Sequence, residues 1–294
     1  LAFSRYFNDG DGSFTIGYTH QNIDELSGMA STTANSSYGK YAASDYNNRT
    51  AQRSIYETEH RLFATMSSTH YFFGADKPTT FNLYFERKSG LPGTYSWDTY
   101  TSRNYGGTAY QREAFGYEKN LNDDSSHLIY VPSGLDDPNV CWGSCDGAPD
   151  LAIANQVLVM LYNQLGLASY AGQIVPNGVY EYPWQTSLDL KITQILPGFR
   201  AEDEFVISLG IENLLNLIDS NKGEIEYGNY NGKMAVLDMF MNEDFSKYIY
   251  PNYKGRGYPD WAYGFNQSNP KGIRKSAVNS IWRAQLGFTY KFSF

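Results

Sequence analysis

The last thirteen residues of the chain alternate strictly between apolar and polar side chains. In WRAQLGFTYKFSF, residues 282–294, every even position is apolar or aromatic, and every odd position is polar or glycine. Because successive side chains of a β-strand point to opposite faces, this period of two predicts a strand with one apolar face. A sheet with one face in water gives the same alternation, so the pattern fixes the strand and not what covers its apolar face.

The length of this run and its aromatic end favour a membrane strand. A tilted strand needs roughly 9–11 residues to cross a bilayer, and aromatic residues gather where hydrocarbon meets water. Tyr290, Phe292 and Phe294 stand at the end of the run. We therefore expect a transmembrane strand whose apolar face meets lipid and whose polar face lines a barrel, with Phe294 at the periplasmic rim.

The same alternation recurs along the chain and predicts further antiparallel strands. Weaker patterns in 224–239 and 245–253 indicate three to five additional strands. The clear runs are 13–20, 79–88, 188–193 and 205–213. A less regular run covers 60–69. The sequence thus predicts an all-β fold.

Connections between these strands come in two lengths. Residues 73–78 and 197–203 are short polar turns, whereas 21–57, 89–183 and 252–277 are long polar stretches. A compact soluble domain seldom holds loops of that length, but outer-membrane barrels combine short periplasmic turns with long extracellular loops. The asymmetry predicts that all long connections lie at one end of the barrel.

One segment of a long connection shows helical rather than strand spacing. In residues 149–166 the apolar Leu151, Ala154, Leu158 and Leu161 recur every three or four positions, followed by Leu165. Proline at the first turn and glycine past the end are typical helix boundaries. About 16 residues are too few to span a bilayer. We therefore expect one short loop helix, packed over the barrel mouth or simply filling loop volume.

Composition supports one large β domain over all 294 residues. Hydrophobic residues make up only 41%, yet the chain carries 26 Tyr and 17 Phe, which suits a barrel with a polar lumen and aromatic girdles. A run of roughly 18 apolar residues, as a membrane helix requires, is absent. A net charge of −8 argues against a nucleic-acid partner, because such binding depends on clustered basic residues.

The two cysteines and four histidines bear on disulfides and metals. Cys141 and Cys145 in CWGSC could form a small-loop disulfide in an oxidising compartment, or half of a metal site. A second cysteine or histidine pair is missing nearby, with His127 the closest, so the disulfide is favoured. The four histidines show no paired spacing typical of a metal site, so the sequence predicts no metal or cofactor. They are His20, His60, His70 and His127.

Two groups of residues are candidates for binding. Aromatic residues of a long connection predict an outer ligand-binding surface, with packing of loop on loop as the alternative. They are Tyr95, Trp97, Tyr100 and Tyr105. Charges on the polar faces of the strands could contact a plug or a translocating solute, or be hydrated and paired across strands. They are Glu86, Lys88, Asp189, Lys191, Glu212, Arg283 and Lys291.

Several stretches together resemble the carboxy-terminal half of Oar-like TonB-dependent receptors. FNLYFERKSGLPGTYSW and FVISLGIENLLNLID contain the most specific parts, ERKSGLP and GIENLLN. The others are HLIYVPSGLDDPNV, LDLKITQILPGF and the aromatic carboxy end. The resemblance implies a 22-stranded barrel in the bacterial outer membrane, an amino-terminal plug, and nutrient uptake when TonB pulls on that plug.

The family's plug, TonB box and signal sequence are not readable in residues 1–294. We therefore expect the chain to be the carboxy-terminal portion of the barrel, without catalysis of its own. The partners implied are outer-membrane lipid, the plug or remainder of the receptor, TonB through the missing plug, and a small-molecule or peptide ligand.

Two other functions fit a barrel of this length. A ten-stranded surface protease of the omptin type would need paired aspartates and an Asp–His couple at the barrel mouth. Asp123, Asp124, His127, Asp136 and Asp137 supply these residue types. A passive pore or protein-export channel is the third hypothesis.

Overall fold

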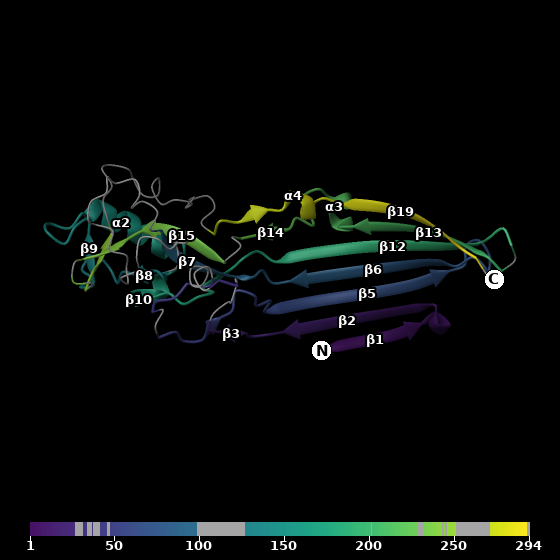
Figure 1. Ribbon diagram of the computed structural model, residues 1–294, viewed down its shortest axis with the longest axis horizontal. Coiled ribbons are helices and arrows are strands. Elements are labelled where there is room, and N and C mark those ends of the chain that lie inside the picture. The colour runs from purple at the N-terminus through teal and green to yellow at the C-terminus, as the bar shows by residue number, and fades with distance from the viewer. Residues whose placement is uncertain are drawn as a thin grey trace.

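The computed structural model contains a large antiparallel sheet at one end and a packed head at the other (Figure 1). We call head the region formed by residues 89–98, 127–183, 232–242 and 246–250. The structure describes residues 1–26, 32–33, 37, 42–45, 48–98, 127–200, 202–228, 232–242, 244, 246–250 and 271–292.

The sheet has seven strands, each antiparallel to its neighbours. Their order in space follows their order in the chain, so every neighbour pair is joined by one connection. The strands are β1 (Ala2–Phe7), β2 (Gly12–His20), β5 (His60–His70), β6 (Thr79–Lys88), β12 (Gln185–Pro197), β13 (Glu204–Glu212) and β19 (Arg283–Lys291). The expected all-β architecture is confirmed; no pairing joins β1 to β19 among the described residues.

The register aligns the alternation of neighbouring strands. Ile192 lies opposite Phe81 on one side and Leu209 on the other, and Leu209 lies opposite Leu286. One residue further along β12, Thr193 lies between small polar residues of the same two neighbours. Because a period of two predominates in these strands, the sheet has one mainly apolar face and one mainly polar face, with Arg5 on the former and Tyr6 on the latter.

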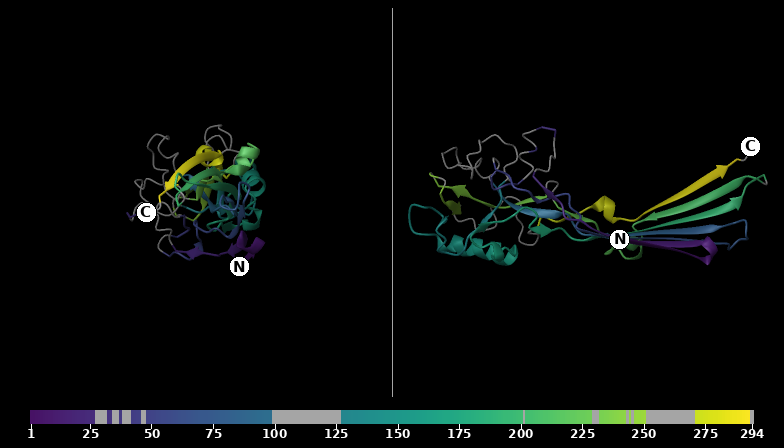
Figure 2. Two further views of the ribbon diagram at one scale, coloured as in Figure 1. Left: turned by 90° about the vertical axis from the view of Figure 1, so that its right-hand side faces the viewer. Right: turned by 90° about the horizontal axis from the view of Figure 1, so that it is seen from below.

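The sheet is a single curved layer. Seen end-on, its strands form an arc from β1 to β19 (Figure 2). Among the described residues, no large apolar side chain of these strands belongs to the buried core, and Ile16, Leu286 and Phe288 are 47%, 59% and 62% exposed. Within the described ranges, the apolar face therefore meets no second layer of protein.

The connections confirm the predicted asymmetry. Residues 8–11, 71–78 and 198–203 are short turns at one end of the sheet, and Asn8, Asp9 and Gly10 take positive φ in the first. The connections that leave the other end are much longer, because antiparallel strands alternate their ends. They comprise residues 21–59, 89–184 and 213–282.

The described parts of the long connections contain strands and helices, which corrects the expectation of polar loops. In the head, β15 (Lys233–Asp238) runs parallel to β7 (Pro92–Asp98), and β17 (Tyr248–Tyr250) runs parallel to β9 (Val140–Trp142). The described residues of 224–239 and 245–250 thus form strands, but these belong to small sheets outside the large one, contrary to the prediction. Further head elements are β8 (Tyr130–Val131), β10 (Gln173–Ile174), β11 (Tyr180–Glu181), β16 (Phe240–Met241) and the 3-10 turn η4 (Ala168–Tyr170).

Short elements connect the sheet to the head. The pairs β3 (Asp24–Glu25) with β4 (Gln52–Arg53), and β14 (Glu226–Tyr227) with β18 (Arg274–Lys275), extend from the long-loop end of the sheet. Helices α3 (Leu214–Ile218) and α4 (Ala277–Ser280) follow β13 and precede β19. Within the described residues, helices long and apolar enough to cross a membrane are not found.

The buried core of the protein lies in the head. Aromatic residues dominate it: the Trp142 and Tyr250 rings stack at 5.3 Å between centroids, and the Tyr130 and Tyr248 rings at 4.6 Å. The Tyr250 hydroxyl donates a 2.6 Å hydrogen bond to the Tyr130 carbonyl, so its polar end is satisfied in the interior. The head thus has the dry, packed centre that the sheet lacks.

The predicted helix is confirmed as α2 (Leu151–Val159), which continues into the π-helical turn η3 (Met160–Gln164). Asp150 caps it by accepting hydrogen bonds from two backbone N–H groups of the first turn, and Gly166 follows with φ +69°. The predicted apolar face is wrong at its start, since Leu151 is 56% exposed. Ala154, Leu161 and Leu165 of the predicted face are buried, and the buried stripe also includes Ile153, Val157 and Met160.

The predicted disulfide between Cys141 and Cys145 is confirmed, with the two Cα atoms 5.0 Å apart. Cys141 belongs to β9, so the bond closes a five-residue loop at the edge of the head core. It reduces the freedom of the unfolded chain only modestly, because loop-closure entropy grows with loop length.

Replacing Cys145 with serine is expected to lower the free energy of unfolding of the head by about 2 kcal/mol, the chain-entropy value for so short a loop. Denaturant unfolding followed by hydrogen exchange of head peptides measures this change. Adding reductant to the wild type serves as the control and should give the same loss. A loss in the sheet instead of the head would contradict the assignment.

Candidate functional site on the polar face of the sheet

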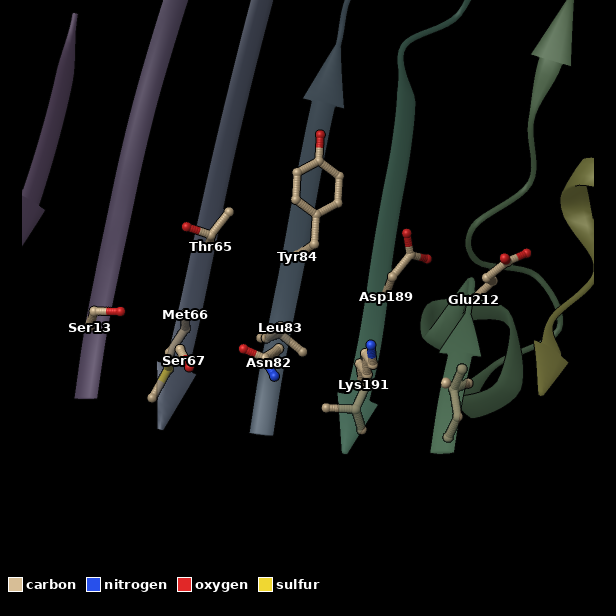
Figure 3. A pocket seen from close by; sticks show the side chains of 13 residues that line it. Ser13, Thr65, Met66, Ser67, Asn82, Leu83, Tyr84, Asp189, Lys191 and Glu212 are labelled. Carbon is tan, nitrogen blue, oxygen red and sulfur yellow. The ribbon is translucent and has the colours of Figure 1, made fainter. Parts of the chain in front are cut away.

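The polar face of the sheet holds a pocket of about 460 Å³ that spans five strands. Figure 3 shows Tyr84, Asp189 and Glu212 on three successive strands, β6, β12 and β13. The other polar-face residues of the lining are Ser13, Thr65, Ser67, Asn82, Lys191 and Gly210. In each strand these residues occupy the alternate positions whose side chains point to the polar face, so the alternation in the sequence brings them together.

Asp189 and Lys191 point from one strand into the pocket region. Asp189 lies opposite Tyr84, and its Oδ1 accepts a 2.8 Å hydrogen bond from the backbone N–H of Asn213. Lys191 lies opposite Asn82 and is exposed. Within the part of the chain that the structure describes, Lys191 makes no ion pair. It is therefore a cation available to an incoming group.

Most other charges of this face pair across neighbouring strands. Arg61 Nε lies 2.6 Å from Glu86 Oε1, and Arg283 Nε lies 3.1 Å from Glu212 Oε2. Lys291 pairs with Glu204 on the adjacent strand at 2.9 Å. The alternative given by the sequence, pairing across strands, is thus found at these positions. Exposed pairs of this kind contribute roughly 0.2–1 kcal/mol each, so they set the charge of the face more than its stability.

Sequence reasoning missed two participants in this network. Arg61 belongs to the least regular of the expected strands, and its guanidinium also donates to the Tyr84 hydroxyl at 3.3 Å. Tyr84 is aromatic, although it stands two positions from the polar Asn82 and Glu86. Arg61 and Tyr84 occupy the alternate positions of β5 and β6 that face the polar side. The period of two in the sequence could therefore have placed both on the polar face.

The pocket offers hydrogen-bond donors and acceptors from hydroxyl, amide and phenol groups, together with the carboxylates of Asp189 and Glu212 and the ammonium of Lys191. Such a set holds polar ligands by hydrogen bonds in water. Pairing leaves Lys191 as the positive charge of the lining that is available to an anionic group.

The aromatic ligand candidates lie elsewhere. Tyr95 and Trp97 are each 1% exposed and belong to the head core, where the Tyr95 ring lies 4.4 Å from that of Tyr180. Their burial fits the alternative, packing of loop on loop. Tyr100 and Tyr105 lie outside the described residues. The structure therefore brings no exposed aromatic surface together from these four residues within its described part.

Of the four aspartates that the protease hypothesis requires, the structure describes Asp136 and Asp137. The Asp137 carboxylate accepts hydrogen bonds from the Tyr130 hydroxyl and from the backbone N–H groups of Ser133 and Asn139. Burial raises the pKa of Asp137, but these hydrogen bonds outweigh it and lower the pKa. Asp136 is exposed, and Asp123 and Asp124 lie outside the described residues.

His127 is buried in the head at 5% exposure. Burial, with a smaller contribution from the nearby charge of Lys233, lowers the pKa of His127 from 6.5 to about 4. At neutral pH the imidazole is therefore uncharged in the folded state.

Acid should destabilise the head through His127. The unfolded chain binds a proton on this residue below pH 6.5, whereas the folded head does so only below about pH 4. The stability that depends on the neutral imidazole is complete above pH 6.5 and decreases on the order of 3 kcal/mol as the pH falls to 4. Hydrogen exchange of head peptides between pH 7 and 4 measures it; His127→Asn should abolish this part of the pH dependence. Equal slopes in wild type and variant would refute the assignment.

Comparison with known proteins gives no relative. No protein-family model matches the chain. Searches of curated proteins and of solved structures likewise find no match. The resemblance to Oar-like receptors therefore rests on the sequence stretches quoted above.

Proposed function

We propose that the chain is the carboxy-terminal barrel portion of an Oar-like TonB-dependent outer-membrane receptor, which takes up a nutrient or other ligand and performs no catalysis. The observation that carries the proposal is the uncovered apolar face of the seven-stranded sheet. Exposed apolar surfaces of this extent mark an interaction with lipid or protein. A face made of strand residues, with a polar face opposite, suits a barrel wall between lipid and water.

The placement of the connections gives the proposed orientation. In outer-membrane barrels short turns face the periplasm and long loops face the outside. The head then lies outside the cell, where ligand arrives, and residues 71–78 and 198–203 lie in the periplasm. A disulfide in the head is consistent with an oxidising environment.

Both edges of the sheet support a larger barrel. A strand edge presents unpaired N–H and C=O groups, which are costly in lipid unless another strand pairs with them. β1 and β19 each have one neighbour among the described residues. In the proposal, further strands of the receptor close the barrel, up to the 22 of the family, and a plug fills it against the polar face. Lys191 and Asp189 are the proposed contacts of plug or solute.

The topology can be tested with two matched cysteine variants. Ala152 in α2 and Ala75 in a short turn are both exposed, so Ala152→Cys and Ala75→Cys disturb little. We expect a membrane-impermeant maleimide to label Ala152→Cys on intact cells, and Ala75→Cys only after the outer membrane is opened. Labelling of both on intact cells, or recovery of the protein outside the outer-membrane fraction, would overturn the proposal.

A separate test on the intact protein distinguishes a TonB-dependent receptor from a passive pore and from a protease. A plugged receptor should show no steady ion conductance in planar bilayers and should crosslink in cells to the periplasmic domain of TonB. Steady conductance without TonB contact would instead support a passive pore. Cleavage of added peptides, lost in Asp124→Asn and His127→Asn, would support the protease hypothesis.

A further inference from the structure

Two histidines that are far apart in the sequence meet across neighbouring strands. His20 at the end of β2 lies directly opposite His60 at the start of β5, and their rings stack at 5.0 Å between centroids. Directly opposed residues of antiparallel strands have Cβ atoms about 4.5–5.5 Å apart. The pair stands at the end of the sheet that faces the head. Spacing along the sequence could not reveal it, because a 39-residue segment separates the two.

Glu59 adds a carboxylate to this pair. Its Oε1 lies 3.3 Å from His60 Nε2, and one ligand atom from each of the three residues lies within 4.8 Å of the others. Donor atoms about 2.0–2.1 Å from a tetrahedral zinc ion lie roughly 3.4 Å apart. Glu59 and His60 already have that separation. His20 is exposed, and its ligand atom lies within 4.8 Å of those of the other two residues.

The remaining polar atoms of the three side chains are held in the way that metal ligands usually are. His20 Nδ1 lies 3.2 Å from the Glu59 carbonyl oxygen and donates to it, which leaves Nε2 with its lone pair. His60 Nδ1 lies 2.8 Å from the Tyr18 hydroxyl, and Glu59 Oε2 lies 2.7 Å from Arg53. Outer partners of this kind fix the tautomer and orientation of metal-binding side chains.

We propose that His20, Glu59 and His60 bind a divalent transition-metal ion of the zinc class, with a fourth position open to water. Two imidazoles and one carboxylate suit Zn²⁺, Ni²⁺ or Cu²⁺, whereas Ca²⁺ and Mg²⁺ prefer sites made of oxygen atoms. The inference rests on the packing of these residues and does not depend on the receptor proposal.

The direct test is calorimetric titration of Zn²⁺ into the intact protein in detergent micelles, with any polyhistidine tag removed. Wild type should bind one equivalent that His20→Ala and His60→Ala each lose. Tyr18→Phe, which removes only an outer partner, should weaken binding of that equivalent by about 10- to 100-fold. His70→Ala is the matched control, because His70 lies at the other end of β5 and contacts Ser68 at 2.9 Å.

Cobalt gives a second readout. Co²⁺ added to wild type should produce the visible absorption bands of a tetrahedral site, and these should be absent in His20→Ala and present in His70→Ala. Far-UV circular dichroism of each variant verifies that the sheet has formed, and His20→Ala is decisive because His20 is exposed. The proposal is overturned if wild type lacks the equivalent, if His20→Ala and His60→Ala retain it, or if His70→Ala loses it as well.

Discussion

In the proposed receptor, Ile192→Arg is expected to destabilise the membrane-inserted protein by roughly 2–4 kcal/mol, the cost of arginine on the lipid face near the middle of a bilayer. Ile192 lies near the centre of β12, between Phe81 and Leu209 on the apolar face. Urea unfolding from lipid vesicles, followed by hydrogen exchange of sheet peptides, measures the loss.

The matched control lies at the next residue. Thr193→Arg introduces the same side chain at the same depth, but on the polar face, between Thr80 and Ser208. We expect a change within about 0.5 kcal/mol there, because Thr193 is only half-buried and a long polar side chain on this face reaches water. Equal losses at 192 and 193 would mean that both faces are covered alike, which would contradict a wall between lipid and water.

Trp142→Ala is expected to destabilise the head by about 3–5 kcal/mol, since it removes a large side chain from a packed interior and leaves a cavity. Trp142 is 2% exposed, stacks on Tyr250, and donates from Nε1 to the Leu135 carbonyl at 2.9 Å. Hydrogen exchange should show head peptides losing protection while peptides of the seven strands keep theirs, because the core does not extend into the sheet.

Trp282→Ala is the control for this variant. Trp282 precedes β19, far from the head core, and is 45% exposed. The same atoms are removed there without a cavity in the head, so head protection should match that of wild type. If Trp142→Ala also loosened the seven strands, the head and the sheet would be one cooperative unit and not two.

The sheet could be predicted from the sequence because its signal is local. A period of two in 79–88, 188–193 and 205–213 marks the strand and its face at once, and the structure confirms both. β1 was not predicted, because AFSRYF shows no clean alternation. Arg5 lies on the apolar side of this strand, and Tyr6 lies on its polar side. Short turns and long connections were equally visible, because polar stretches can be measured directly.

The head could not be predicted in the same way. Its strands pair across long sequence separations, as β7 with β15 and β9 with β17. β9 and β17 have only three residues each, which are too few to show a period. Tyr95 and Trp97 are amphipathic side chains that suit either a surface or an interior, and only packing decides between them. The His20–His60 contact depends on strand register, which local patterns do not specify.

The division between a sheet with an exposed apolar face and a head with a buried core has a consequence for handling the protein. In the proposed receptor, urea and high temperature act on the head through its buried core, whereas removing amphiphile acts on the sheet through its exposed leucines, isoleucines and phenylalanines. A medium that protects one region offers little to the other. Purification conditions should therefore be chosen by following both halves separately, because a signal averaged over the chain would hide the loss of either.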